Sequence, residues 1–343
     1  MTRLWTRVTA HRSGRAIARV WLIAWAATAL WQSTGDIAMA EASLETEFRN
    51  AVQESGDAYR EARKTILARG SAAEPFLQAQ LASGDWKIAL TANILDGWLK
   101  TPALFDKCTD AVQGNLVDRL PITGSFPPKR RIAEIRLLGK VVTPRLLEMV
   151  WKTGEYGGPQ ERGSIFGGLA VLKDERSVVP LIDLMRTAPE EDIRGWAAST
   201  LGPLKDARAD SPLLDVLRSQ TAPAELRASA AMSLGTLGAK EAVPELRTIA
   251  LNDHADLDLR KSAVRSLGDL GDSASAEPLL RVLSRPHDLA FELVILEAVG
   301  KIGSPSILPR LDDLEVNHHE EAVREGAKEA ADEIKERSGA KRH

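Results

Sequence analysis

A short element, Leu-Gly-x-Leu-Gly, recurs along the chain, and this repetition constrains the fold more than any other feature. The copies are Leu138-Gly139, Leu169–Lys173, Leu201–Lys205, Leu234–Gly238, Leu267–Gly271 and Val299–Gly303. Leu234–Gly238 and Leu267–Gly271 match the element fully, and the other copies match it in part. Successive copies are 31 to 33 residues apart. A fixed period of this length is the signature of a repeat architecture.

Each copy sits in the same local pattern. Apolar residues three or four apart precede it, as Leu226, Ala230 and Leu234 do, and such residues share one helix face. The glycines are expected to end that helix, because glycine adopts the left-handed conformation at low cost. A proline follows about ten residues later and suits the first turn of a second helix; these prolines are Pro144, Pro180, Pro212, Pro244, Pro278 and Pro309.

The predicted unit is therefore helix, tight turn, helix. Neither helix can bury its apolar stripe alone, so the pairs must stack on one another. The sequence predicts an all-α solenoid of stacked antiparallel helix pairs.

This pattern resembles the HEAT-like repeats, particularly the short bacterial form related to phycobilisome-lyase repeats. That form reads Leu-Arg-x-x-Ala-x-x-x-Leu-Gly-x-Leu-Gly, followed by a proline-led helix. Leu226–Gly238 and Leu259–Gly271 fit it closely, Ile193–Lys205 has a lysine at the last glycine, and Phe291–Gly303 has Glu292 in place of the arginine. The resemblance covers roughly residues 130–335 and implies a right-handed solenoid whose second helices line a concave face.

The repeats and their flanks divide the chain into four segments. Residues 1–40 are an export signal, 41–128 are degenerate helical repeats ending in a proline-rich break, 129–337 are the regular array with a C-terminal capping helix, and 338–343 are a disordered tail. Within the second segment, 59–81 looks like a degenerate helix pair, and 86–107, with Gly97, is a candidate for another.

The first 40 residues have the features of a signal peptide. Five arginines precede the apolar run Val20–Trp31, and Ala38-Met39-Ala40 supplies a small-x-small cleavage pattern. The apolar run is shorter than the roughly 20 residues of a transmembrane helix. We expect cleavage after Ala40 and a periplasmic or secreted protein; an uncleaved anchor in the inner membrane is the alternative.

Charge and cysteine content narrow the functional classes. Cleavage removes five arginines and one aspartate, which leaves 45 − 5 = 40 basic and 48 − 1 = 47 acidic residues, a net charge of −7. Duplex-DNA binders usually show the opposite balance, so no nucleic-acid partner is expected. Cys108 is the single cysteine, so no intrachain disulfide can form, and a buried inert thiol is favoured over a catalytic one.

No catalytic or cofactor motif stands out. The chain lacks a phosphate-binding glycine loop, a Gly-x-Ser-x-Gly elbow and a His-Glu-x-x-His pair. His318–Glu321 and Asp253–Asp258 are the two groups of metal-ligand residue types. A solvated helix start and helix-capping acids explain them more simply, so neither a metal nor a cofactor is predicted.

A charged row on the second helices is the candidate binding site. Three residues after each proline of the later repeats stand Asp183, Asp215, Arg247, Arg281 and Asp312. Stacking would align them on the concave face, where they could match the charges of a partner. The alternative is that exposed helix positions are simply charged.

Two further features have two interpretations each. Trp196 replaces mostly small residues at its repeat position and is either a packing residue or an aromatic anchor at an interface. Arg194, Arg227 and Arg260 each follow an acid by two residues. Capping and ion pairing between repeats is favoured for them over a role in binding.

The function predicted from these features is a non-catalytic scaffold in the bacterial cell envelope that binds a protein or peptide on the concave face of the solenoid. The resemblance also allows an enzyme of the bilin-lyase or DNA-glycosylase kind, although cytoplasmic substrates conflict with export. A membrane-tethered assembly factor is the third alternative and requires an uncleaved N-terminus.

The predicted cleavage can be checked by mass spectrometry of the protein isolated from cells. We expect a mature chain that begins at Glu41, because cleavage follows the second small residue of Ala38-Met39-Ala40. A chain that retains Met1 would contradict this prediction and favour the anchored form.

Overall fold

The computed structural model describes residue 39 and residues 41–54, 56–100, 143–144, 146–148, 150–151, 159–285 and 288–339. Within these ranges the chain forms helices joined by short turns, and they contain no strand. The all-α fold predicted from the repeat is therefore confirmed. Contacts divide the chain into two compact units, 1–100 and 101–343, which are described separately.

The first unit packs helical residues 41–53 with three further helices, α2 (Gly56–Ala68), α3 (Glu74–Gln80) and α4 (Trp86–Lys100). Its core contains Phe48, Tyr59 and Leu77. Gly97 lies inside α4 and does not end a helix, so residues 86–100 form one helix. The remainder of the candidate pair at 86–107 lies outside the described residues, and that pair stays a prediction. Residues 1–38, Ala40, Cys108, the proline-rich break at 121–128 and the element at Leu138 lie outside the described residues.

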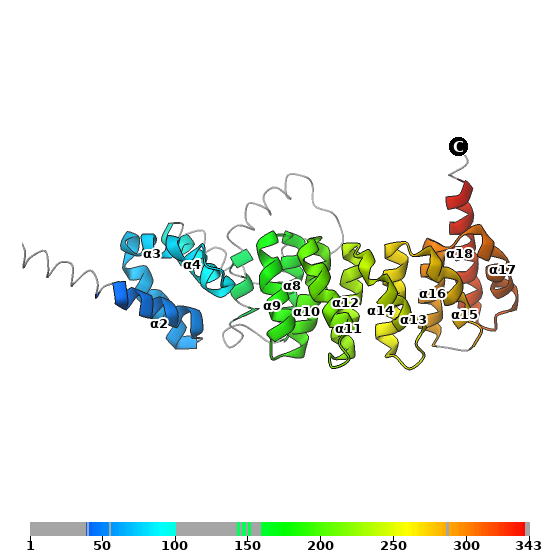
Figure 1. Ribbon diagram of the computed structural model, residues 1–343, viewed down its shortest axis with the longest axis horizontal. Helices are drawn as coiled ribbons and strands as arrows, with labels where there is room; N and C mark the ends of the chain where they lie inside the picture. The colour runs from blue at the N-terminus through cyan, green and yellow to red at the C-terminus, as the bar shows by residue number, and fades with distance from the viewer. Residues whose placement is uncertain are drawn as a thin grey trace, which may run out of the picture. The chain divides into compact units, whose positions relative to one another are not determined.

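The second unit contains the repeat array, whose helices follow one another in Figure 1 from green to red. First helices alternate with shorter second helices, and one long helix ends the series. The first helices are α8 (Pro159–Leu172), α10 (Glu191–Leu204), α12 (Ala224–Leu237), α14 (Leu257–Leu270) and α16 (Leu289–Ile302). The second helices are α9 (Val178–Thr187), α11 (Asp210–Arg218), α13 (Val243–Leu251), α15 (Ala276–Val282) and α17 (Leu308–Asn317), and α18 (Glu321–Gly339) completes the array.

The prolines and glycines take distinct places in each repeat. The repeat prolines from Pro180 onward lie in the first turns of the second helices, as predicted. Of the two glycines, only the second ends the first helix: Gly238 and Gly271 have left-handed φ values of 87° and 73°. Lys173 and Lys205 adopt the same conformation at the ends of α8 and α10 without glycine's freedom.

The first glycine of each element lies inside the helix, where the next first helix comes very close. A Cβ atom on Gly235 would lie 2.8 Å from Cα of Ser266, and one on Gly202 would lie 2.9 Å from Cα of Ser233. Successive first helices therefore pack backbone against backbone. Each second helix packs mainly on the first helix that follows it.

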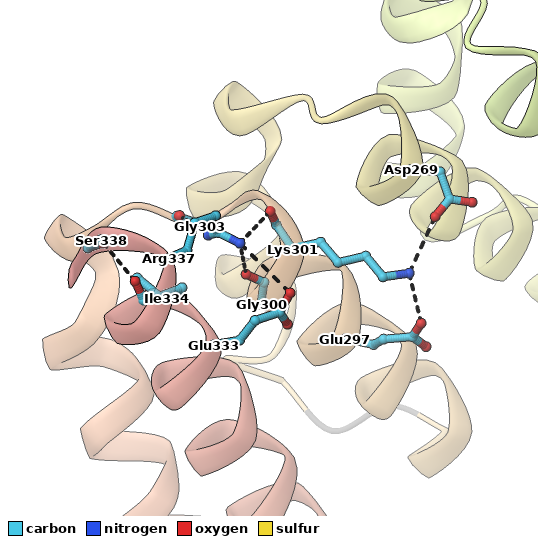
Figure 2. A network of polar contacts seen from close by, with 9 residues as sticks. All are labelled: Asp269, Glu297, Gly300, Lys301, Gly303, Glu333, Ile334, Arg337 and Ser338. Carbon is cyan, nitrogen blue, oxygen red and sulfur yellow. Dashed lines mark hydrogen bonds and ion pairs between the residues drawn. The ribbon is translucent and has the colours of Figure 1, made fainter. Parts of the chain in front are cut away.

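Helix α18 occupies the place of a sixth first helix and ends the series. Its Ala330 faces Gly300 of α16 as Ala298 faces Gly268. Figure 2 shows that Arg337, near the end of α18, caps α16: its Nη1 donates to the carbonyls of Gly300 and Lys301, both over 2.7 Å, and its Nη2 donates to Gly303. Gly303 has a φ of −64°, so here a guanidinium replaces the left-handed glycine cap.

The helical C-terminus corrects the predicted boundary of the tail. Helix α18 continues through Gly339, two residues into the segment 338–343 that was expected to be disordered. Arg337 anchors this last turn, and the Ser338 hydroxyl donates to the carbonyl of Ile334 over 2.6 Å. Residues 340–343 lie outside the described part of the chain.

The close helix contact predicts opposite effects for two glycine-to-alanine substitutions. Gly235→Ala should lower the free energy of unfolding by about 1–3 kcal/mol, because the new methyl group collides with Ser266. Gly167→Ala, inside α8, has nothing within 4 Å and should raise it by about 0.5–1 kcal/mol. Urea denaturation followed by circular dichroism measures both; equal effects would contradict the role of Gly235.

Candidate functional site

The structure places the five predicted charges on five successive second helices. Asp183, Asp215, Arg247, Arg281 and Asp312 lie in α9, α11, α13, α15 and α17, respectively. Each lies three residues after a proline of the first turn, so the five positions are equivalent in the repeats. We call these five residues the second-helix stripe.

Part of the second-helix stripe is engaged by contacts between repeats. Arg247 Nη2 lies 2.7 Å from Asp272 Oδ2, and Arg247 Nε donates to Ser275 Oγ over 3.1 Å. Both partners belong to the turn before α15, so Arg247 joins α13 to the next repeat. Asp215 Oδ2 lies 3.3 Å from Nη2 of Arg186 in α9.

The environment of Asp272 shows how firmly Arg247 is held. Partial burial alone would raise the pKa of this carboxyl group, but hydrogen bonds from Ser275 and Arg247 outweigh burial and lower the pKa below its ordinary value. Arg247 therefore faces a carboxylate that stays ionised at neutral pH. Its guanidinium has a structural role that the one-dimensional pattern did not reveal.

Other positions of the second-helix stripe remain open to solvent. The Arg281 side chain is 69% exposed, with Glu277 of its own helix 3.6 Å away, and Asp215 and Asp312 are exposed. Apolar side chains are exposed on the same set of helices: Val179 on α9, Leu251 on α13 and, at 73%, Val316 on α17. The second helices thus present charged and apolar groups together.

Trp196 makes a packing contact within the array. Its ring lies 5.8 Å from the ring of Phe166 in α8, measured between centroids. A Cβ atom on Gly163 would lie 3.4 Å from the indole, so the ring covers this glycine of the preceding first helix. These contacts agree with the packing interpretation of Trp196, whose ring is half-buried.

The helix-start arginines cap the preceding second helices. Each lies at the fourth position of a first helix, or of α18, and donates to a carbonyl at the end of the second helix before it. The bonds run from Arg194 Nη1 to Ala188, from Arg227 Nε to Leu217, from Arg260 Nε to Ala250 and from Arg324 Nη1 to His318, over 3.0, 3.0, 3.3 and 2.8 Å. A cation at a helix C-terminus satisfies carbonyls that have no partner in the helix.

The acids two residues before these arginines have other contacts. Asp192 Oδ1 accepts the backbone N–H of Ile193, and Asp258 Oδ1 lies 3.8 Å from Nζ of Lys261. Arg260 instead pairs with Asp253 over 3.0 Å and lies over the ring of Phe291. These bonds agree with the interpretation of capping and ion pairing. The acids that pair with the arginines are Asp253 and, 3.6 Å from Arg194, Glu191.

One repeat departs from the arginine pattern and creates a buried polar pair. Glu292 occupies the fourth position of α16, and its side chain is only 3% exposed. Its Oε2 lies 4.0 Å from Nε2 of His318, which is 11% exposed. The backbone N–H of Glu320 donates to Nδ1 of His318, so the neutral ring carries its proton on Nε2, toward Glu292.

The two groups of candidate metal ligands have other bonds. Asp253 pairs with Arg260 and Arg285, and Asp256 caps α14 by accepting the N–H groups of Asp258 and Leu259. In the part of the chain that the structure describes, no three histidine, cysteine or acidic side chains gather in a way that could hold a metal ion. The same residues contain no helix with the length and apolar character needed to cross a bilayer.

These observations define the class of protein as an α-solenoid built from short helical repeats. Family models match it in two places: HEAT repeats over residues 211–294 and the PBS lyase HEAT-like repeat over residues 193–219. The chain therefore contains HEAT-like repeats within residues 193–294. Comparison with curated proteins gives no match.

Two natural proteins are among the solved structures that match the chain. The complex of CpcE and CpcF of phycocyanin lyase from Nostoc sp. PCC7120 is 21% identical, over 76% of this chain and 94% of the other, with a TM-score of 0.34. Human deoxyhypusine hydroxylase in complex with glycerol is 15% identical, over 88% of this chain and 99% of the other, with a TM-score of 0.33. Neither likeness extends to function at this level of identity.

The arginine caps can be tested against an exposed arginine of the same array. Arg260→Met should lower the free energy of unfolding by about 2–4 kcal/mol, because it leaves the Ala250 carbonyl and Asp253 without their buried cation, whose side chain is 5% exposed. Arg281→Met should change it by less than about 0.5 kcal/mol. Denaturant unfolding of the two variants provides the comparison, and a neutral Arg260→Met would refute the capping role.

Proposed function

We propose that this HEAT-repeat protein is a non-catalytic scaffold that binds a protein or peptide on its second helices. The observation that carries the proposal is the combination of exposed charges and exposed apolar side chains along α9 to α17. Asp215, Arg281 and Asp312 supply the charges, and Val179 and Val316 supply apolar contacts. Protein interfaces combine these two kinds of group, with apolar contacts surrounded by polar ones.

The structure alters which residues of the second-helix stripe should contact a partner. Arg247 is held by Asp272 and Ser275, so its replacement would disturb the array as well as any interface. Arg281 and Asp312 are better candidates because they project from the surface without a bond to another repeat among the described residues. The binding surface we propose therefore centres on Arg281 and Asp312. It includes Asp183 and Asp215, the latter exposed although it pairs with Arg186 of α9.

We further propose that the scaffold works in the cell envelope. The proposal is supported by the signal-like segment before Ala40 and by the position of the first buried side chains. Leu44 and Phe48 belong to the core of the first unit and follow the predicted cleavage position directly. Cleavage there would release a chain that keeps every core residue found in the described part of this unit.

Catalysis is the alternative, and the pair of Glu292 and His318 is the observation that favours it. A carboxylate that orients an imidazole is a common arrangement for acid–base chemistry. Both side chains are almost completely buried, however, and Nδ1 of His318 already accepts a backbone N–H. A structural role joining α16 to the loop before α18 explains the pair with fewer assumptions.

Site-specific photo-crosslinking in cells tests the scaffold. A photoreactive residue at Asp215, Arg281 or Asp312 should produce the same crosslinked partner from each position, because the three lie on one row of second helices. The matched control positions are Ser199, Arg265 and Glu297, which are exposed at one equivalent position of the first helices.

The pattern of crosslinking decides the outcome. A partner captured from the second helices and not from the first helices supports the proposal. Equal capture from both sets, or none from either, contradicts it. Glu292→Gln distinguishes the alternative: a scaffold retains its partner in this variant, whereas an enzyme that uses Glu292 loses turnover.

A further inference from the structure

Polar contacts between successive first helices change character along the array. We call the contact between one first helix and the next a joint. In the earlier joints, a buried hydroxyl group of one first helix donates to a carbonyl group of the first helix before it. Ser233 Oγ donates to Ala198 over 2.7 Å, and Ser266 Oγ donates to Ala231 over 2.8 Å. Thr200 makes the corresponding, longer contact with Phe166. These bonds join α8, α10, α12 and α14.

The joint between α14 and α16 lacks this bond. Ala298 occupies the position of Ser233 and Ser266, and its Cα lies 3.2 Å from a Cβ placed on Gly268. Close apolar packing therefore continues across the joint without the buried hydroxyl. The arginine cap is missing from the same repeat, because Glu292 stands at its position.

Ion pairs at both ends of the joint take the place of the hydroxyl. At the N-terminal end of the helices, Nζ of Lys261 in α14 lies 3.0 Å from Oδ1 of Asp288, the N-cap of α16. At the C-terminal end, Nζ of Lys301 in α16 lies 3.3 Å from Asp269 of α14 and 3.0 Å from Glu297. Figure 2 shows Lys301 extending between these two carboxylates.

Asp288 and Lys301, one from each pair, keep their charges over a wide range of pH. The hydrogen bond from Lys261 lowers the pKa of Asp288, and the hydrogen bond to Glu297 raises the pKa of Lys301. The contribution of the aspartate is lost only as the pH falls through its lowered pKa, and that of the lysine only as the pH rises through its raised pKa. Between about pH 5 and pH 9 both remain ionised.

Salt acts differently on the two kinds of joint. Dissolved ions screen exposed charges over about 10 Å at 0.1 M ionic strength, and the carboxylates of both pairs are exposed. A buried hydroxyl-to-carbonyl bond has no net charge to screen. In a repeat array each interface between neighbouring repeats contributes separately to the free energy of unfolding. Weakening one joint therefore destabilises mainly the helices on either side of it.

We infer that the joint between α14 and α16 is an ionic-strength-sensitive joint in the array. As salt rises, α16 with α17 and α18 loosens from the preceding repeats. The joints from α8 to α14 lose less, because buried hydroxyl bonds hold their first helices even though the exposed pair of Arg186 with Asp215 is screened as well.

Within this C-terminal group, Arg337 ties α18 to α16. The pair of Arg310 in α17 with Glu277 in α15, 2.6 Å apart and partly exposed, also links the group to the preceding repeat and is screened together with the pairs of Lys261 and Lys301.

Hydrogen exchange of the full chain, measured by mass spectrometry at pH 7, tests the inference. Raising NaCl from 20 mM to 500 mM should speed exchange in α16 by roughly three- to tenfold, the range expected from losing a few weak ion pairs. Exchange in α10 and α12 should change by less than twofold, roughly. A uniform response, or a larger one at α10 and α12, would overturn the inference.

Two variants locate the effect. Lys261→Met combined with Lys301→Met should exchange at low salt as the unchanged chain does at high salt, and should lose the salt response of α16. Ser266→Ala, at the joint between α12 and α14, should speed exchange there equally at both salt concentrations. A salt response that survives both lysine substitutions would refute the role of the pairs, and the salt series on the unchanged chain stands even if a variant fails to fold.

Discussion

The near contact of backbones between successive first helices is the constraint on which the array depends. Where Gly202, Gly235, Gly268 and Gly300 meet the next helix, a methyl group would lie between 2.8 and 3.3 Å from its Cα atoms. This contact fixes the distance between repeats, and its register is the same throughout, because each glycine meets a serine or alanine at the tenth position of the next helix. The second helices do not make this close backbone contact with one another. They are shorter than the first helices, and their exposed side chains vary in charge.

The repetition and the prolines were enough to predict the all-α solenoid and the helix order from α8 onward. The separate tasks of the two glycines were harder to see, because both match the same element. Gly235 gives room for Ser266, whereas Gly238 provides the left-handed turn. Lys205 shows that the left-handed turn does not require glycine. The sequence pattern did not identify α18 as a further first helix, because Asp332 and Lys335 occupy the positions of the two glycines.

The second-helix stripe marks the limit of what the sequence could reveal. Its five positions do lie on successive second helices, as the spacing implied. Their partners, however, are set by stacking: Arg247 meets Asp272, which is 25 residues away in the chain, and Asp215 meets Arg186, which is 29 residues away. The same holds for Arg337, whose three carbonyl partners lie at the end of a helix more than thirty residues earlier. Charge alone could not distinguish such structural contacts from exposed groups.

Unequal joints give the proposed binding surface two regions with different properties. A partner that contacts Asp183 and Asp215 would rest on repeats joined by buried hydroxyl groups, which hold their spacing as conditions vary. A partner that reaches from Leu251 to Val316 would cross the joint held by Lys261 and Lys301, and its fit would depend on the spacing of two groups of helices. Binding across this joint would hold the two groups together, because a ligand that requires one arrangement stabilises that arrangement by its own binding free energy. Affinity in the second region would then fall with salt even for an uncharged partner, since the screened charges lie within the scaffold and not at the interface.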